Sequence, residues 1–152
     1  MRVELARTAG FCYGVRRAVQ LAEEAAGQGR PCVMLGPIIH NRDEISRLEA
    51  MGVGLAASME EIPEGSAVLI RSHGEGRAVH EALAARGCTV IDATCPNVSR
   101  IHGIVSQAEG EGRQVLIIGT PTHPEVAAIA GWCAHPVVLE GAEALSNWLD
   151  EA

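Results

Sequence analysis

The chain has 152 residues, of which 47% are hydrophobic, which is enough apolar material for the core of at least one domain. A net charge of −7 and an aromatic content of 3% disfavour nucleic-acid binding, which needs a basic surface and stacking platforms. All 12 basic residues are arginine, so a Schiff-base lysine and a P-loop lysine are excluded. Because no stretch is apolar enough for a membrane helix or a signal peptide, we expect a cytoplasmic protein that binds no membrane.

Short apolar runs rich in β-branched residues alternate along the chain with segments of helical period. The predicted strands cover residues 3–6, 33–36, 67–70, 88–92, 115–119 and 137–139. Near-continuous apolar strands that alternate with helices are typical of parallel sheets buried on both sides. The sequence therefore predicts an α/β fold with a mostly parallel sheet and helices on both faces.

The predicted strands are distributed unevenly, with a weak boundary near residue 95. Residues 1–95 hold four or five predicted strands, and we interpret them as a first α/β domain. Residues 96–152 hold about two strands and three helices, too few to bury a parallel sheet. We therefore expect one complete unit followed by an incomplete second α/β domain.

Polar residues flanked by glycine or proline follow most of the predicted strands. Ligands of open α/β sheets bind beyond the carboxyl ends of the strands, where helix N-termini point unpaired N–H groups outward. The residues at these positions are Cys12, His40, Asn41, Ser72, His73, Thr94, Cys95, His123 and Glu125. We expect the functional site at this edge of the sheet.

Three histidines stand at strand-to-helix transitions, namely His40, His73 and His123. Imidazoles near helix N-termini suit a diphosphate, which accepts their hydrogen bonds and interacts favourably with the helix dipoles. Histidines inside the predicted helices, such as His102, are interpreted as structural. Glu125 is either a first-turn helix residue favoured by the dipole or a general acid beside His123.

The five cysteines differ in their surroundings. Cys32 and Cys88 begin apolar strands and are predicted to be core residues, and Cys133 is interpreted as structural. Cys12 and Cys95 lie in polar turns beside helix N-termini, which lower a thiol pKa. Their spacing alone leaves three alternatives open: a redox pair, a catalytic thiol or two ligands of a metal centre.

Five motifs in this order and spacing resemble those of the 4-hydroxy-3-methylbut-2-enyl diphosphate reductases. They are GFCYGV at 10–15, IIHN at 38–41, SHG at 72–74, DATCP at 92–96 and THPE at 122–125. The resemblance extends from residue 2 to about residue 145. It implies three α/β domains related by pseudo-threefold symmetry, which surround a [4Fe–4S] cluster and each supply one cysteine.

The resemblance also implies roles for individual residues. Cys12 and Cys95 would bind the cluster, and Glu125 would belong to the proton relay for the leaving hydroxyl. The diphosphate would be held by His40, His73 and His123. The implied reaction is a two-electron reductive dehydroxylation that yields isopentenyl and dimethylallyl diphosphate, the last step of the non-mevalonate isoprenoid pathway. A one-electron donor such as ferredoxin or flavodoxin would be the partner.

The chain departs from the family pattern in its length. It is expected to stop partway through the second domain, without the third cluster cysteine, the serine and asparagine of the diphosphate site, or the threonine of the proton relay. Cys133 does not match the third cysteine. The chain is thus a fragment, one of two subunits or a short homologue, and the alternative function is a non-catalytic α/β module that binds a phosphorylated metabolite. A thiol enzyme is disfavoured, since no base accompanies Cys12 or Cys95.

Overall fold

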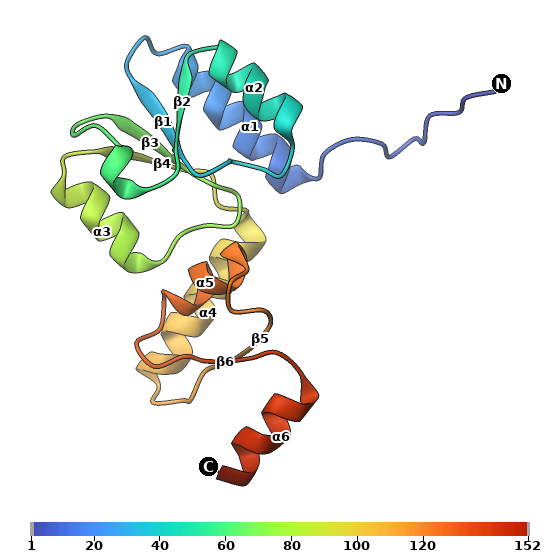
Figure 1. Cartoon of the computed structure of the whole chain (residues 1–152), viewed down its shortest axis with the longest axis vertical. Coiled ribbons are helices and arrows are strands. Elements are labelled where there is room, and N and C mark those ends of the chain that lie inside the picture. Colours follow the sequence, from blue (N-terminus) through green and yellow to red (C-terminus); the bar gives the residue numbers. More distant parts are fainter. Residues whose placement is uncertain (1, 152) are drawn as a thin grey trace.

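The computed structural model describes residues 2–151 and contains two separate parallel sheets (Figure 1). The first sheet has the strand order β2-β1-β3-β4. Its strands are β1 (Cys32–Leu35), β2 (Val53–Ala56), β3 (Ala67–Ile70) and β4 (Thr89–Asp92). The elements around it are α1 (Tyr13–Ala26), α2 (Arg42–Ala50), the 3₁₀ turn η1 (Met59–Glu61) and α3 (Arg77–Ala85). All neighbouring strands are parallel, which confirms the predicted α/β class.

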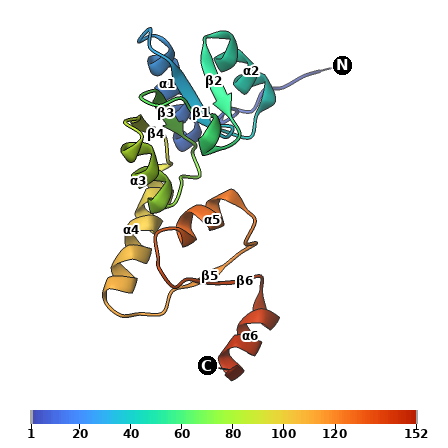
Figure 2. The same cartoon turned by 60° about the vertical axis from the view of Figure 1, so that its left-hand side comes forward.

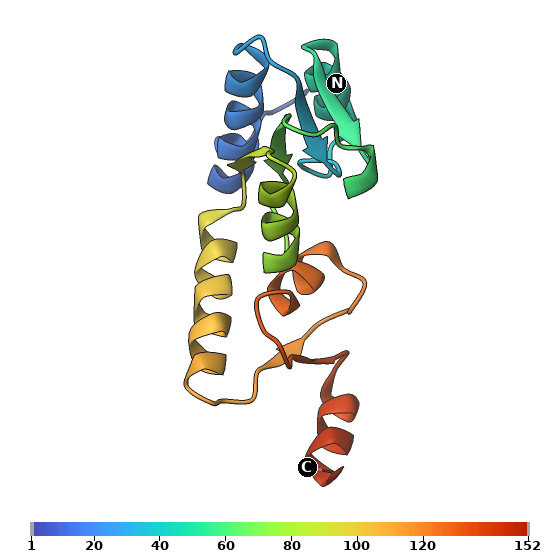
Figure 3. The same cartoon turned by 90° about the vertical axis from the view of Figure 1, so that its left-hand side faces the viewer.

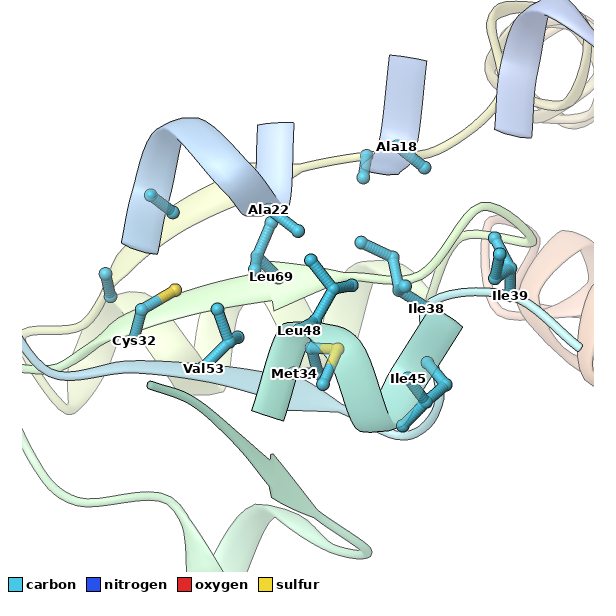
Figure 4. Packing of buried hydrophobic residues seen from close by; sticks show 13 residues of the cluster. Ala18, Ala22, Cys32, Met34, Ile38, Ile39, Ile45, Leu48, Val53 and Leu69 are labelled. Atoms are coloured by element: carbon cyan, nitrogen blue, oxygen red, sulfur yellow. The ribbon is translucent and has the colours of Figure 1, made fainter. Parts of the chain in front are cut away.

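The first sheet has a core on each face because successive side chains of a strand point to opposite sides. Met34 and Leu69 lie on the face covered by α1 and α2, where the small residues Ala18 and Ala22 let α1 approach closely (Figure 4). Val68 and Ile70 of β3 face the other way and pack with Leu83 of α3. All four residues of β3 are buried, as expected for a central strand covered on both sides.

The second sheet is smaller and has only β5 and β6, which pair in parallel. Its elements are α4 (Pro96–Gly110), β5 (Leu116–Ile118), α5 (Pro124–Ala130), β6 (Val137–Leu139) and α6 (Ala142–Glu151). The core of this unit is a single cluster whose buried members are Val105, Val115, Ile117 and Ile129. On the opposite face of β5, the side chain of Ile118 is 59% exposed. This face of β5 is thus left open to solvent.

Two strand assignments differ from the sequence prediction. Residues 3–6 do not form a strand, and their apolar side chains are exposed, Val3 by 79% and Leu5 by 87%. Alternating apolar residues form a strand only beside a partner, and this arm extends away from both sheets (Figure 1). The fourth strand of the first sheet is instead β2, which the prediction missed because its four residues include Gly54, a poor strand former.

The two sheets are joined through α4, which follows β4 after a linker of three residues and packs against α5 (Figures 2 and 3). A second connection lies beside α3, where the N–H of Arg77 donates to the carbonyl of Gly131 at 3.1 Å. Here a Cβ atom on Gly131 would lie 2.6 Å from the Cα of Gly76. The backbones of the two units therefore touch at a point that excludes side chains. No helix within residues 2–151 is both long and apolar enough to cross a bilayer.

Candidate functional site

The order of strands in the first sheet creates a switch point between β1 and β3. The chain passes from β1 outward to β2, returns to β3 on the other side of β1, and then continues outward to β4. Loops that leave two such neighbouring strands run in opposite directions and open a crevice at their carboxyl ends. The loop after β1 carries His40 and the loop after β3 carries His73. A hydrogen bond of 3.1 Å from the N–H of Ser72 to the carbonyl of Ile38 ties the two loops together.

The three predicted histidines lie in one cluster. The ring centroids of His40 and His73 are 4.8 Å apart, and those of His73 and His123 are 5.8 Å apart with the rings nearly perpendicular. His40 and His73 come from the first sheet, whereas His123 begins α5 in the second unit. The cluster therefore spans the joint between the two units.

His123 caps its own helix, and this contact defines the proton position on its ring. The N–H of Glu125 donates to Nδ1 of His123 at 3.2 Å. A neutral imidazole that accepts at Nδ1 carries its hydrogen on Nε2. His123 can therefore donate a hydrogen bond from Nε2 without being protonated. Glu125 is held half-buried in the same first turn of α5.

His73 is the most enclosed of the three histidines. Burial lowers the pKa of His73, and nearby His40 and Arg71 lower it further, while the carboxylate of Glu125 opposes them. Its Nδ1 atom is buried and has no hydrogen-bond partner among residues 2–151. Such an unpaired buried polar atom is costly, so His73 has an unused hydrogen-bonding group in the middle of the cluster.

An ion pair behind His73 was not foreseen from the sequence. Arg71 and Glu75 flank His73 in the same loop, and their side chains form a largely buried ion pair of 2.5 Å. Arg71 directly follows a fully buried strand, which is the one signal in the sequence that could have marked it. The loop that carries His73 therefore also carries one positive and one negative side chain, which are paired with each other.

Cys12 and Cys95 occupy equivalent positions at the starts of two helices. Each is the N-cap residue, of α1 and α4 respectively, and neither side chain is used to cap. Sγ of Cys95 lies 2.6 Å from the position that a Cβ atom on Gly14 would take, so this thiol rests on the first turn of α1. Cys12 is exposed and Cys95 is half-buried. The structure therefore brings both thiols to the α1 N-terminus.

Arg17 of α1 holds this arrangement, and sequence reasoning missed it. Its guanidinium donates to the carbonyls of Thr94 at 3.2 Å and Asp92 at 3.3 Å. The N–H of Cys95 in turn donates to the carbonyl of Ser72 at 2.9 Å. The turn that carries Cys95 is thus fixed both to α1 and to the His73 loop.

The other three cysteines lie away from this edge. Cys32 is buried in the first core, and burial raises the pKa of its thiol. Cys88 is half-buried at the start of β4. The thiol of Cys133 donates to Glu109 at 3.2 Å. Within residues 2–151, no three histidine, cysteine or carboxylate side chains are grouped to bind one metal ion. Two free thiols without a third ligand fit part of a shared metal cluster and not a complete site.

A cavity of about 250 Å³ lies beside two of the histidines. It is lined by Phe11, which precedes Cys12, and by His40, Ser72 and His73. Its position places a small ligand between the α1 N-terminus and two of the histidines.

Comparison with known proteins identifies relatives over almost the whole chain. Residues 3–151 match the family model described as LytB protein. The 4-hydroxy-3-methylbut-2-enyl diphosphate reductase of Aquifex aeolicus is 47% identical over 129 residues, which cover 84% of this chain and 44% of that protein. The enzyme of the same name from Nitratiruptor is 40% identical over 97% of this chain and 52% of its own length.

Solved structures agree with this match. A reductase described as the terminal enzyme of the non-mevalonate pathway superposes with a TM-score of 0.84 at 43% identity, over 95% of this chain and 53% of that one. The E-1-hydroxy-2-methyl-but-2-enyl-4-diphosphate reductase of Plasmodium falciparum gives a TM-score of 0.87 at 27% identity, over 92% of this chain and 45% of that one. The chain spans about half the length of these relatives. The match of residues 3–151 to the family model nevertheless shows that the chain belongs to the LytB family.

Proposed function

We propose that this chain forms the substrate-binding and proton-donating part of a 4-hydroxy-3-methylbut-2-enyl diphosphate reductase. The observation that carries the proposal is the convergence of His40, His73 and His123, from three loops and both sheets, beside two thiols at helix N-termini. Membership of the LytB family supports the same activity.

The histidine cluster is the proposed diphosphate site. The groups near this position that can donate hydrogen bonds include the imidazoles, the hydroxyl of Ser72 and backbone amides. His123 presents Nε2–H, and His73 has an unpaired Nδ1 among the described residues. The N-terminus of α2, which follows His40, adds a favourable dipole for an anion.

Cys12 and Cys95 are proposed as two cysteine ligands of a [4Fe–4S] cluster. Both thiols lie at helix N-termini, and neither is used to cap its helix. A third cysteine would have to come from outside this chain, since Cys133 is engaged with Glu109 in the second unit. When bound, the cluster would supply the electrons of the reaction one at a time, received from a ferredoxin or flavodoxin.

Glu125 is proposed as the acid that protonates the leaving hydroxyl. The overall reaction breaks one C–O bond, takes up two electrons and two protons, and releases water together with isopentenyl or dimethylallyl diphosphate. Glu125 is half-buried in the first turn of α5, and its charge acts on the ring of His73. A carboxyl group at this position can deliver a proton close to a substrate whose diphosphate is held by the histidines.

The division of labour follows the two units, which we propose to be a first α/β domain of residues 1–95 and an incomplete second domain of residues 96–152. The first supplies His40, His73 and Cys12. The second supplies His123 and Glu125.

Binding of inorganic diphosphate to the 152-residue chain, measured by calorimetry, tests the proposed site. Replacement of His40, His73 or His123 by alanine removes a charge-assisted hydrogen bond, and we expect about ten- to a hundredfold weaker binding for each. The matched control is His135→Ala, which alters an exposed histidine of a loop in the second unit. Equal losses in His135→Ala, or unchanged binding in the other three variants, would contradict the site.

A further inference from the structure

The joint between the two units contains an aromatic pair that the proposed function does not use. His102 of α4 stacks on Trp132, with ring centroids 5.2 Å apart and 17° between the planes. His102 is only 5% exposed and therefore cannot reach a ligand at the surface. Trp132 lies in the turn directly after α5, the helix whose N-cap residue is His123.

Both rings contact the loop that carries His73. The indole N–H of Trp132 donates to the carbonyl of Glu75 at 2.9 Å. Cε1 of His102 lies 2.6 Å from the position that a Cβ atom on Gly74 would take, and Gly74 has a φ of +78°. Gly74 and Glu75, which directly follow His73, are thus both held by side chains of the second unit.

The orientation of Trp132 is itself fixed from two helices. The guanidinium of Arg77 in α3 lies 5.5 Å from the centre of the indole ring, a cation–π contact. The hydroxyl of Ser106 in α4 donates to the carbonyl of Trp132 at 3.0 Å and accepts from Arg77 at 3.2 Å. Since α3 belongs to the first unit and α4 to the second, Trp132 is held from both sides of the joint.

We propose that Trp132 and His102 are positioning residues, which clamp the loop of Gly74 and Glu75 so that His73 faces His123. The 5.8 Å separation of the two imidazoles depends on how the units meet, because one comes from each. The inference rests on the proposed function in one respect, that these imidazoles bind a diphosphate. The clamp acts through His73, since the contacts of Trp132 and His102 are with the residues that follow it.

Replacement of Trp132 in the 152-residue chain tests the clamp with two readouts. We expect Trp132→Ala to move the imidazole NMR signals of His73 without any ligand and to weaken binding of inorganic diphosphate about tenfold. Trp132→Phe keeps an aromatic ring on His102 but loses the hydrogen bond to Glu75, so its loss of affinity should be smaller than that of Trp132→Ala, about threefold. The matched control is Trp148→Ala in α6, which should change neither readout.

A double-mutant cycle tests the contribution of His102. Gly74→Ala places a methyl group against the His102 ring, so we expect weaker diphosphate binding and shifted His73 signals. In the combined variant Gly74→Ala with His102→Ala, only part of the loss should be recovered, since the conflict with the ring is removed while the contact with Thr94 and the strain of the positive φ remain. Far-UV circular dichroism establishes that each variant is folded.

The outcomes separate the clamp from the proposed function. Shifted His73 signals in Trp132→Ala, together with no diphosphate binding by the unmodified chain, would support the clamp and overturn the diphosphate site. A folded Trp132→Ala variant with unchanged His73 signals and affinity would overturn the clamp. If Trp132→Ala does not fold, a strictly additive cycle for Gly74 and His102 would overturn it instead.

Discussion

The two sheets of the molecule differ in how well they bury their strands. Every residue of β3 in the first sheet is buried, and a core lies on each of its faces. In β5 of the second sheet only Ile117 is buried, and the unit has a single small core. The candidate site draws on both, with His40 and His73 on the first and His123 on the second. A well-packed sheet thus fixes one side of the site, whereas the other side depends on contacts across the joint.

The largest expected effect concerns the metal cluster, which tests whether the two units together can hold it. After anaerobic reconstitution with iron and sulfide, we expect the 152-residue chain to retain no stable [4Fe–4S] cluster, because two cysteines leave two irons without protein ligands. In a chimaera that replaces the matching half of the Aquifex aeolicus reductase with this chain, the cluster should form. There, Cys12→Ser or Cys95→Ser should remove most of it.

Cys133→Ser in the same chimaera is the control and should leave the iron and sulfide content unchanged, since this thiol bonds to Glu109. Visible and paramagnetic-resonance spectra measure the result. A stable cluster in the unmodified 152-residue chain would mean that a third ligand lies within it.

The next effect tests the contribution of the second unit. In the chimaera, Glu125→Gln keeps the shape of the side chain but removes its acidic proton, and turnover should fall by about 10²–10⁴. Single-turnover reduction with a chemical electron donor measures the rate. Glu143→Gln, which also alters a first-turn glutamate, in α6, is the control. Near-normal turnover of Glu125→Gln would assign this carboxylate a structural role.

A smaller effect compares the two cores directly. Leu69 is fully buried between the first sheet and its helices, so Leu69→Ala should lower the free energy of unfolding by about 2–5 kcal/mol. Ile117 is 9% exposed and belongs to the smaller core of the second unit, so Ile117→Ala should lower the free energy of unfolding by only roughly 1–2 kcal/mol. Urea denaturation followed by circular dichroism measures both, and equal costs would contradict the difference in packing.

The smallest effect is a loss of stability in acid. Burial lowers the pKa of His73 and of His102 below the ordinary value of about 6.5, so the unfolded chain takes up protons more readily than the folded one. The contribution of these two histidines to the free energy of unfolding should be constant above pH 6.5. Below that pH it should fall, by up to about 1.4 kcal/mol per pH unit for each group. Urea midpoints between pH 5 and 8 measure the slope, which His102→Gln should reduce and His135→Gln should not.

Local sequence patterns predict much of this fold. The apolar runs at 67–70 and 137–139 coincide with β3 and β6, because buried parallel strands are apolar on both faces. Residues 3–6 also have apolar side chains at strand spacing, yet they form no strand, since the formation of a strand depends on a partner. Strand β2 is the opposite case: its segment contains glycine and has a weak strand pattern, but it forms a strand because it pairs with β1.

The candidate site was predictable to the extent that it depends on topology. Carboxyl ends of neighbouring parallel strands meet at one edge, which is why His40 and His73 could be expected close together. The contacts of Arg17 with the Cys95 turn and of Trp132 with the His73 loop could not be expected. They join residues more than 50 positions apart, and no local pattern records such pairs.

The contact of Gly76 with Gly131 has a consequence for motion between the two units. Backbone meets backbone there, and a Cβ atom on Gly131 would lie 2.6 Å from the Cα of Gly76. No side chain fits between the two backbones at this point, so the close approach of the units depends on both residues being glycine. The hydrogen bonds of Trp132 with Glu75 and of Arg77 with Ser106 cross the same joint and resist a rotation about the contact. Any separation of the two units would therefore have to break these hydrogen bonds as well.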